Sequence, residues 1–81
     1  QNYPNPFNPE TEILFDIAVT SFTKLTVYDA AGREAGTLVN ELLKNGRYKV
    51  QLNAGNLSSG IYFYRLESGS FVQTRKMILL K

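Results

Sequence analysis

Three residue types are absent from this chain of 81 residues: cysteine, histidine and tryptophan. Without cysteine the chain can form neither a disulfide framework, nor a thiolate nucleophile, nor a cysteine-based zinc site. Without histidine it lacks the commonest general base and transition-metal ligand. We therefore expect a protein that is not an enzyme and that needs no cofactor. The lack of cysteine leaves the compartment open, because exported and cytosolic proteins alike can do without disulfides.

Long hydrophobic runs and a strong charge are also missing. The longest aliphatic run extends only from Met77 to Leu80, whereas a membrane-spanning helix needs ~20 apolar residues. The formal net charge of +2 is too weak for the electrostatic footprint of a nucleic-acid-binding protein. Hydrophobic residues make up 43% of the chain, which is typical of a globular domain. Because Gln1 follows neither an initiator Met nor a signal peptide, we expect a module from the end of a longer protein.

All three prolines lie within the first nine residues. Proline fixes its own φ and pushes the preceding residue towards extended geometry, so this segment cannot pair regularly as a strand. We expect residues 1–10 to form an N-terminal strap, anchored by Tyr3 and Phe7, that packs over an open end of a domain formed by residues 11–81. Ligand docking by the strap is the alternative.

The rest of the chain alternates apolar and polar residues with the period of two that is typical of half-buried strands. Strands are predicted around six segments, which are 12–19, 23–29, 34–39, 48–52, 61–66 and 71–80. The segment 61–66 is apolar on both faces, which indicates a central strand. Residues 40–46 are compatible with a helix but too short for a stable one, so we expect a connection that ends in the Asn45–Gly46 turn.

These strands, with a seventh near the strap or in residues 40–46, indicate an all-β fold: an antiparallel immunoglobulin-like β-sandwich of about seven strands. Within residues 56–64, a Gly-x-Tyr sequence resembles the tyrosine corner of such domains. Tyr62, Tyr64 and Leu66 should then point into the core, with the tyrosine hydroxyl bonded to the backbone of the upstream loop. A sugar-stacking role for the tyrosines is the alternative.

No catalytic or metal-binding constellation is recognisable. The acidic residues are scattered over different strands and turns, and no glycine-rich phosphate loop is present. Ser58, Ser59 and Gly60 do not form a nucleophile elbow, because no partner base exists. Asp29 lies beside a turn at Gly32 and could bind calcium, but a turn-forming aspartate is the favoured interpretation.

The segment 74–81 has two interpretations. It is a closing strand with Met77 and Leu79 on one face, Ile78 and Leu80 on the other, and flanking charges that protect against aggregation. Alternatively, it is an exposed basic and apolar strand that another protein recognises by β-augmentation. The same exposed edge would permit a weak homodimer.

Four motifs in the same order resemble the type A C-terminal sorting domain of the type IX secretion system. They are residues 1–11, Val27–Asp29 with Gly32, Leu57–Tyr62, and Thr74–Met77. The resemblance places the family's opening motif, which is mainly structural, on Tyr3, Pro4, Asn5, Pro6 and Phe7, and its central motif on Gly60 and Tyr62. It places the end motif, and so the recognition of the sorting signal, on Lys76, Met77, Ile78 and Leu79, with Leu80 and Lys81 following.

This resemblance implies a non-catalytic signal at the C-terminus of an exported cargo. The cargo would cross the inner membrane by a separate N-terminal signal, pass through the periplasm, and be directed by this domain across the outer membrane. The implied partners are the type IX translocon, the cargo and a cysteine-protease sortase that cuts before or near Gln1. The cargo would then stay on the cell surface or be released.

Two other classes remain open on sequence grounds. The immunoglobulin-like domain of the flagellar hook-capping protein shares the opening motif and the Gly-x-Tyr strand, and would make the chain a scaffold. A carbohydrate-binding or adhesion module would need a flat row of exposed aromatic residues, for which only Tyr28, Tyr48 and Phe63 are available. The sorting interpretation is favoured because the chain ends four residues after Met77.

Overall fold

The structure, a computed structural model, describes residues 10–53 and 55–80. All regular structure in these ranges consists of strands: β1 (Glu10–Ile17), β2 (Ser21–Asp29), β3 (Glu34–Leu43), β4 (Gly46–Asn53), β5 (Gly60–Ser68) and β6 (Phe71–Leu79). A helix with the length and hydropathy of a membrane span is absent from this part of the chain. The predicted strap, residues 1–10, lies outside the described residues except for Glu10, which belongs to β1.

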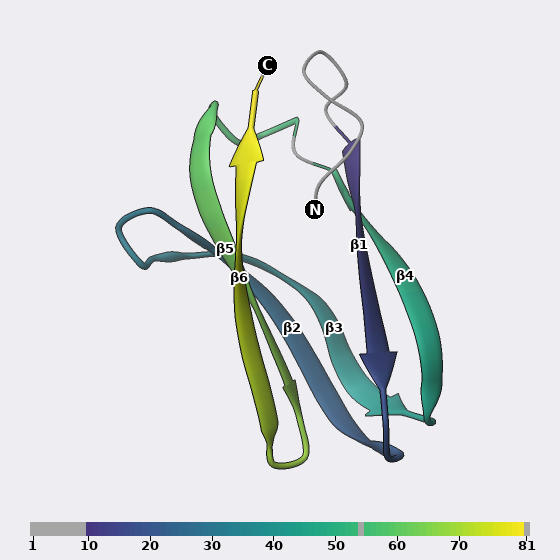
Figure 1. Ribbon diagram of the computed structural model, residues 1–81. Coiled ribbons are helices and arrows are strands. Elements are labelled where there is room, and N and C mark those ends of the chain that lie inside the picture. The colour runs from purple at the N-terminus through teal and green to yellow at the C-terminus, as the bar shows by residue number, and fades with distance from the viewer. Residues whose placement is uncertain (1–9, 54, 81) are drawn as a thin grey trace.

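The strands form two antiparallel sheets. β1 pairs with β4 in a two-stranded sheet, and the other strands form a four-stranded sheet in the order β3-β2-β5-β6. Figure 1 shows β1 and β4 together on one side of the molecule and β6 beside β5 on the other. The all-β sandwich is confirmed, with six strands among the described residues where about seven were predicted. The central position predicted for residues 61–66 is confirmed, because β5 lies between β2 and β6.

The core lies between the two sheets, and all six strands contribute to it. Its buried members are Ile13, Phe15, Ile17, Leu25, Val27, Val39, Leu52, Tyr62, Tyr64, Leu66, Met77 and Leu79. Successive side chains of a strand point to opposite faces, so the alternation in the sequence predicted most of this set. The prediction that Tyr62, Tyr64 and Leu66 point into the core is confirmed.

The prediction of a connection over residues 40–46 is wrong, because β3 continues to Leu43. The end of β3 pairs with the start of β2, with Leu43 opposite Ser21 and Leu42 opposite Phe22. This pairing gives residues 40–43 hydrogen-bond partners on the side of the backbone that faces β2, and such tertiary contacts override a weak local preference for helix. The strand predicted over residues 12–19 also ends earlier, at Ile17, so that Val19 follows β1 and is 71% exposed.

Candidate functional site at the terminal strand

The candidate recognition strand is β6, which forms one edge of the four-stranded sheet. It pairs with β5 along its whole length, from Phe71 opposite Ser68 to Leu79 opposite Gly60. An edge strand presents one side of its backbone outside the sheet, where a further strand can pair with it. The position of β6 is therefore suited to recognition by another protein.

The end of β6 divides its side chains between the core and the surface. Met77 is 2% exposed and Leu79 is 7% exposed, so both belong to the core. Ile78 and Leu80 are 47% and 51% exposed, and Lys76 is exposed on the same outer face. Of the predicted recognition residues, these three present accessible side chains, while Lys81 lies outside the described residues.

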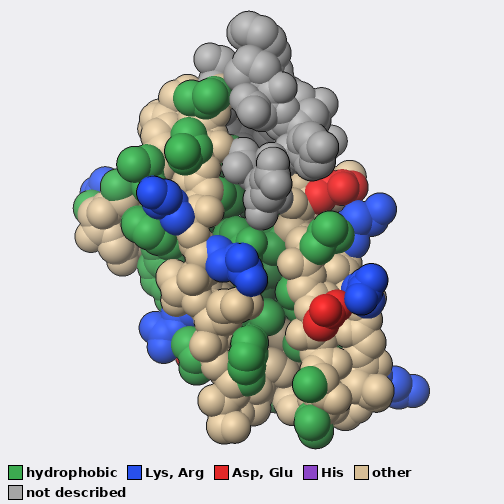
Figure 2. Space-filling model, viewed as in Figure 1, with side chains coloured by type: hydrophobic (Ala, Val, Ile, Leu, Met, Phe, Trp, Pro, Cys, Tyr) green, Lys and Arg blue, Asp and Glu red, His purple; other side chains and the backbone are tan. Residues whose placement is uncertain are grey.

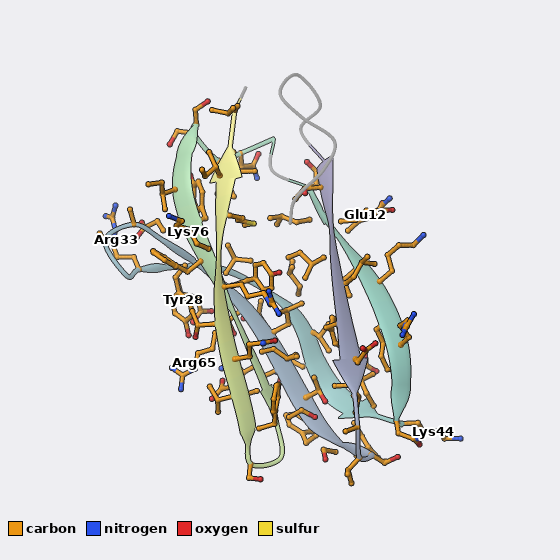
Figure 3. All side chains as sticks on the ribbon, in the orientation of Figure 1. Glu12, Tyr28, Arg33, Lys44, Arg65 and Lys76 are labelled. Carbon is orange, nitrogen blue, oxygen red and sulfur yellow. The ribbon has the colours of Figure 1, made fainter. Side chains whose placement is uncertain are left out.

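The outer face next to the end of β6 is apolar and bordered by basic residues. Ile78 pairs with Ile61, which is 44% exposed, and Lys76 pairs with Phe63. Phe63 pairs in turn with the half-buried Tyr28 of β2. Figure 3 shows Tyr28, Lys76 and two arginines labelled on the side of this sheet that faces away from β1 and β4. A partner that contacts this face would meet apolar surface together with positive charge.

The inward face of β6 has a feature that the sequence did not reveal. Phe71, Gln73 and Arg75 share the side of the strand that carries Met77, but all three are exposed. The facing sheet has only two strands and does not cover this half of β6. Alternation predicts which face a residue occupies, but it carries no information about the width of the sheet opposite.

Gly60 and Tyr62 form the tyrosine corner, as predicted. The Tyr62 hydroxyl donates a hydrogen bond to the backbone oxygen of Ser58, at 2.8 Å. Gly60 has a φ of 155°, which side chains disfavour, and no heavy atom lies within 4 Å of the position that a Cβ would occupy. Glycine at this position therefore serves the backbone conformation and not a close contact. The opening motif from Tyr3 to Phe7 lies outside the described residues.

The carboxylate of Asp29 accepts three hydrogen bonds within the turn after β2. Its Oδ1 accepts hydrogen bonds from the backbone N–H groups of Ala31 and Arg33, at 3.0 and 2.9 Å. Its Oδ2 accepts a hydrogen bond from Nε of Arg33, at 3.0 Å. The backbone N–H of Arg33 is the main cause that lowers the pKa of Asp29 below its usual value. These contacts support the turn-forming interpretation, and no cluster of three metal-binding side chains occurs in the described ranges.

The aromatic residues that could stack on a sugar do not form one row. Tyr48 of β4 stacks on Phe15, with ring centroids 5.5 Å apart and planes inclined by 15°. Its hydroxyl donates to the backbone oxygen of Lys44, at 2.7 Å. Tyr28 and Phe63 lie together on the other sheet. This separation does not favour a carbohydrate-binding surface.

The structure is thus a small β-sandwich with β6 at the edge of its larger sheet, beside an apolar outer face that is bordered by basic residues. The family described as the secretion system C-terminal sorting domain matches residues 1–80, and the chain belongs to this family. No match was found among curated proteins or among solved structures.

Membership makes the chain a C-terminal secretion signal of type IX secretion. The family is one of secretion signals and is not a family of enzymes. A sorting domain implies attachment to a cargo, interaction with the type IX secretion machinery, and export to the cell surface or the extracellular space. The scaffold and carbohydrate-binding alternatives are therefore not favoured.

Proposed function

We propose that this domain directs its attached cargo across the outer membrane, and that the type IX translocon reads the end of β6. The observation that carries this proposal is the division of β6 into two sets of side chains. Met77 and Leu79 fix the strand to the core. Lys76, Ile78 and Leu80, followed by Lys81, supply the contacts for recognition, next to a sheet edge that can accept a further strand.

The proposed route has steps on both sides of this recognition event. The cargo crosses the inner membrane by its own N-terminal signal and reaches the periplasm with the folded domain attached. After translocation, a cysteine-protease sortase cuts before or near Gln1, and the cargo is anchored or released. Family membership supports this route.

A fusion tests the proposal. Residues 1–81 are placed after a fluorescent protein that carries an N-terminal export signal, in a host with type IX secretion. We expect fluorescence at the cell surface or in the medium, and periplasmic retention when the translocon is deleted. Removal of residues 76–81 should also retain the reporter in the periplasm. Secretion that survives this removal would show that the end of β6 is not the signal.

A further inference from the structure

A hollow opens between the edges of the two sheets, next to the uncovered half of β6. Two adjoining cavities of about 350 and 300 Å³ both reach Asp16 and Phe71. We call the two cavities together the β1–β6 slot. The walls of the larger cavity include Phe15, Leu25, Tyr64, Leu66, Phe71 and Arg75. Figure 2 shows hydrophobic side chains in the hollow between the β6 side and the β1 side of the molecule. The floor of the slot is therefore formed by buried core side chains, and Phe71, which is 51% exposed, stands at its wall.

The dimensions and borders of the slot match one extended strand. β1 and β6 are both edge strands, and they border the slot from different sheets. From Phe71 to Arg75 the inward face of β6 is exposed over five residues, which at ~3.3 Å per residue is about 15 Å. A strand placed beside β1 would face Phe71, Gln73 and Arg75 and would widen the smaller sheet.

Arg75 is the basic residue that lines the slot. Arg75 and Lys76 are the charged residues of β6, which contains no acid. The carboxylate that lines the slot, Asp16, forms an exposed ion pair with Arg47, whose Nε lies 3.2 Å from Oδ1. Arg75 has no ion pair within the described part of the chain. An acidic group that enters the slot would therefore meet an uncompensated guanidinium.

We propose that the β1–β6 slot receives an extended segment of a partner protein, with apolar side chains facing the slot and an acidic side chain among them. The apolar side chains pack on Tyr64, Leu66 and Phe71, and the acidic one pairs with Arg75. The inserted strand pairs with an exposed sheet edge and covers Phe71. This inference deepens the proposed function and rests on it, since the partner is the component that reads the domain.

A second copy of the chain fits the slot less well. Pairing of two β6 strands would place the basic pair Arg75 and Lys76 of each copy close to the same pair of the other. Like charges that face each other across paired strands are destabilising. Such a dimer would be weak, whereas an acidic segment gains from the same charges.

Peptide binding to the full chain tests the inference. The probe is a short peptide with a central glutamate, valine at every second position on either side, and threonine between them. Its matched control carries lysine instead of glutamate. We expect backbone amide signals of Phe71–Arg75 and Leu14–Asp16 to shift in NMR titrations, with binding about tenfold weaker for the lysine peptide. Added salt should weaken the binding of the glutamate peptide.

Two neighbouring substitutions add one negative charge each to opposite faces of β6. Gln73→Glu introduces the charge inside the slot and should weaken binding of the glutamate peptide about tenfold. Thr74→Glu introduces it on the outer face, opposite Arg65, and should leave the binding unchanged. Equal effects of the two substitutions, or shifts confined to the outer face, would overturn the inference. Equal binding of both peptides, or a slot closed by a stable dimer, would also overturn it.

Secretion of the reporter fusion distinguishes this inference from the proposed function. If the unaltered fusion is not secreted, the sorting function fails irrespective of peptide binding. If it is secreted, and Gln73→Glu lowers its secretion while Thr74→Glu does not, the inference is supported. Unchanged secretion of the Gln73→Glu fusion would overturn the slot inference and leave the sorting function intact.

Discussion

At the residue scale, the stability of the sandwich depends on a few polar groups. The hydrogen bond from the Tyr62 hydroxyl to the Ser58 oxygen ties the loop before β5 to the core. Inside the sandwich, Thr23 and Ser68 share a buried hydrogen bond of 2.9 Å between their hydroxyl groups. Thr26 is also fully buried, but its hydroxyl has no hydrogen-bond partner in the described part of the chain.

Removal of the Tyr62 hydroxyl should destabilise the domain. Tyr62→Phe keeps the buried ring but leaves the Ser58 oxygen without this donor, so the free energy of unfolding should fall by about 1 kcal/mol. Urea denaturation measures the change. Tyr28→Phe is the control, because the Tyr28 hydroxyl makes no hydrogen bond with a described residue. Equal losses for the two variants would contradict the role of the tyrosine corner.

Substitution of the two buried threonines by valine should change the free energy of unfolding in opposite directions. Thr26→Val removes an unsatisfied buried hydroxyl and should raise the free energy of unfolding by about 1 kcal/mol. Thr23→Val leaves the Ser68 hydroxyl without its partner and should lower it by about 1–3 kcal/mol. Thermal or urea unfolding of both variants measures these changes, and a loss for Thr26→Val would contradict the assignment.

The turn at Asp29 should make part of the stability depend on pH. Its pKa is lower in the folded chain than its usual value of 3.8. The resulting stabilisation is therefore complete well above pH 3.8, and is lost as the pH falls through the lowered pKa. Asp29→Asn should lose less stability on acidification than the unaltered chain. Thermal unfolding across the acid range measures this, and parallel curves for the two proteins would count against it.

At the element scale, the alternation of apolar and polar residues predicted which face of each strand is buried, but not which strands pair with each other. Tyr62, Tyr64 and Leu66 were predicted to point inward, and they do so because a strand presents successive side chains to opposite faces. The continuation of β3 to Leu43 was not predicted, because it depends on pairing with the start of β2 at the open end of this hairpin and not on local sequence preference. The exposure of Arg75 was not predicted either, because it depends on the number of strands in the facing sheet.

The division of β6 between core and surface predicts unequal costs for neighbouring residues. Met77→Ala leaves a cavity in the core and should lower the free energy of unfolding by about 2–5 kcal/mol. Ile78→Ala shortens a side chain that is 47% exposed. It should change the free energy of unfolding by less than about 0.5–1 kcal/mol. Urea denaturation of both variants tests this division. A similar cost for the two would show that Ile78 is part of the core.

At the scale of the whole molecule, the sandwich holds β6 in a fixed position. The smaller sheet supplies Ile13, Phe15 and Leu52 to the core against which Met77 and Leu79 pack. The larger sheet carries β6 at its edge, so that the outer face of β6 is presented by a folded support. In this account the fold positions the signal, and the exposed side chains of β6 are the signal.

Secretion of a reporter whose domain stays folded tests this account most directly. The triple variant Lys76→Glu, Ile78→Asp and Leu80→Asp changes the exposed face of β6 and leaves Met77 and Leu79 in place. A matched variant carries the same changes of charge at exposed positions of β3 and the turn after it, away from the slot, namely Ala35→Asp, Leu42→Asp and Lys44→Glu.

Circular dichroism should show both variants folded before secretion is compared. The account predicts that the β6 variant remains in the periplasm at the level of a fusion without the domain, while the matched variant is secreted like the unaltered fusion. Secretion of the folded β6 variant at the unaltered level would contradict it.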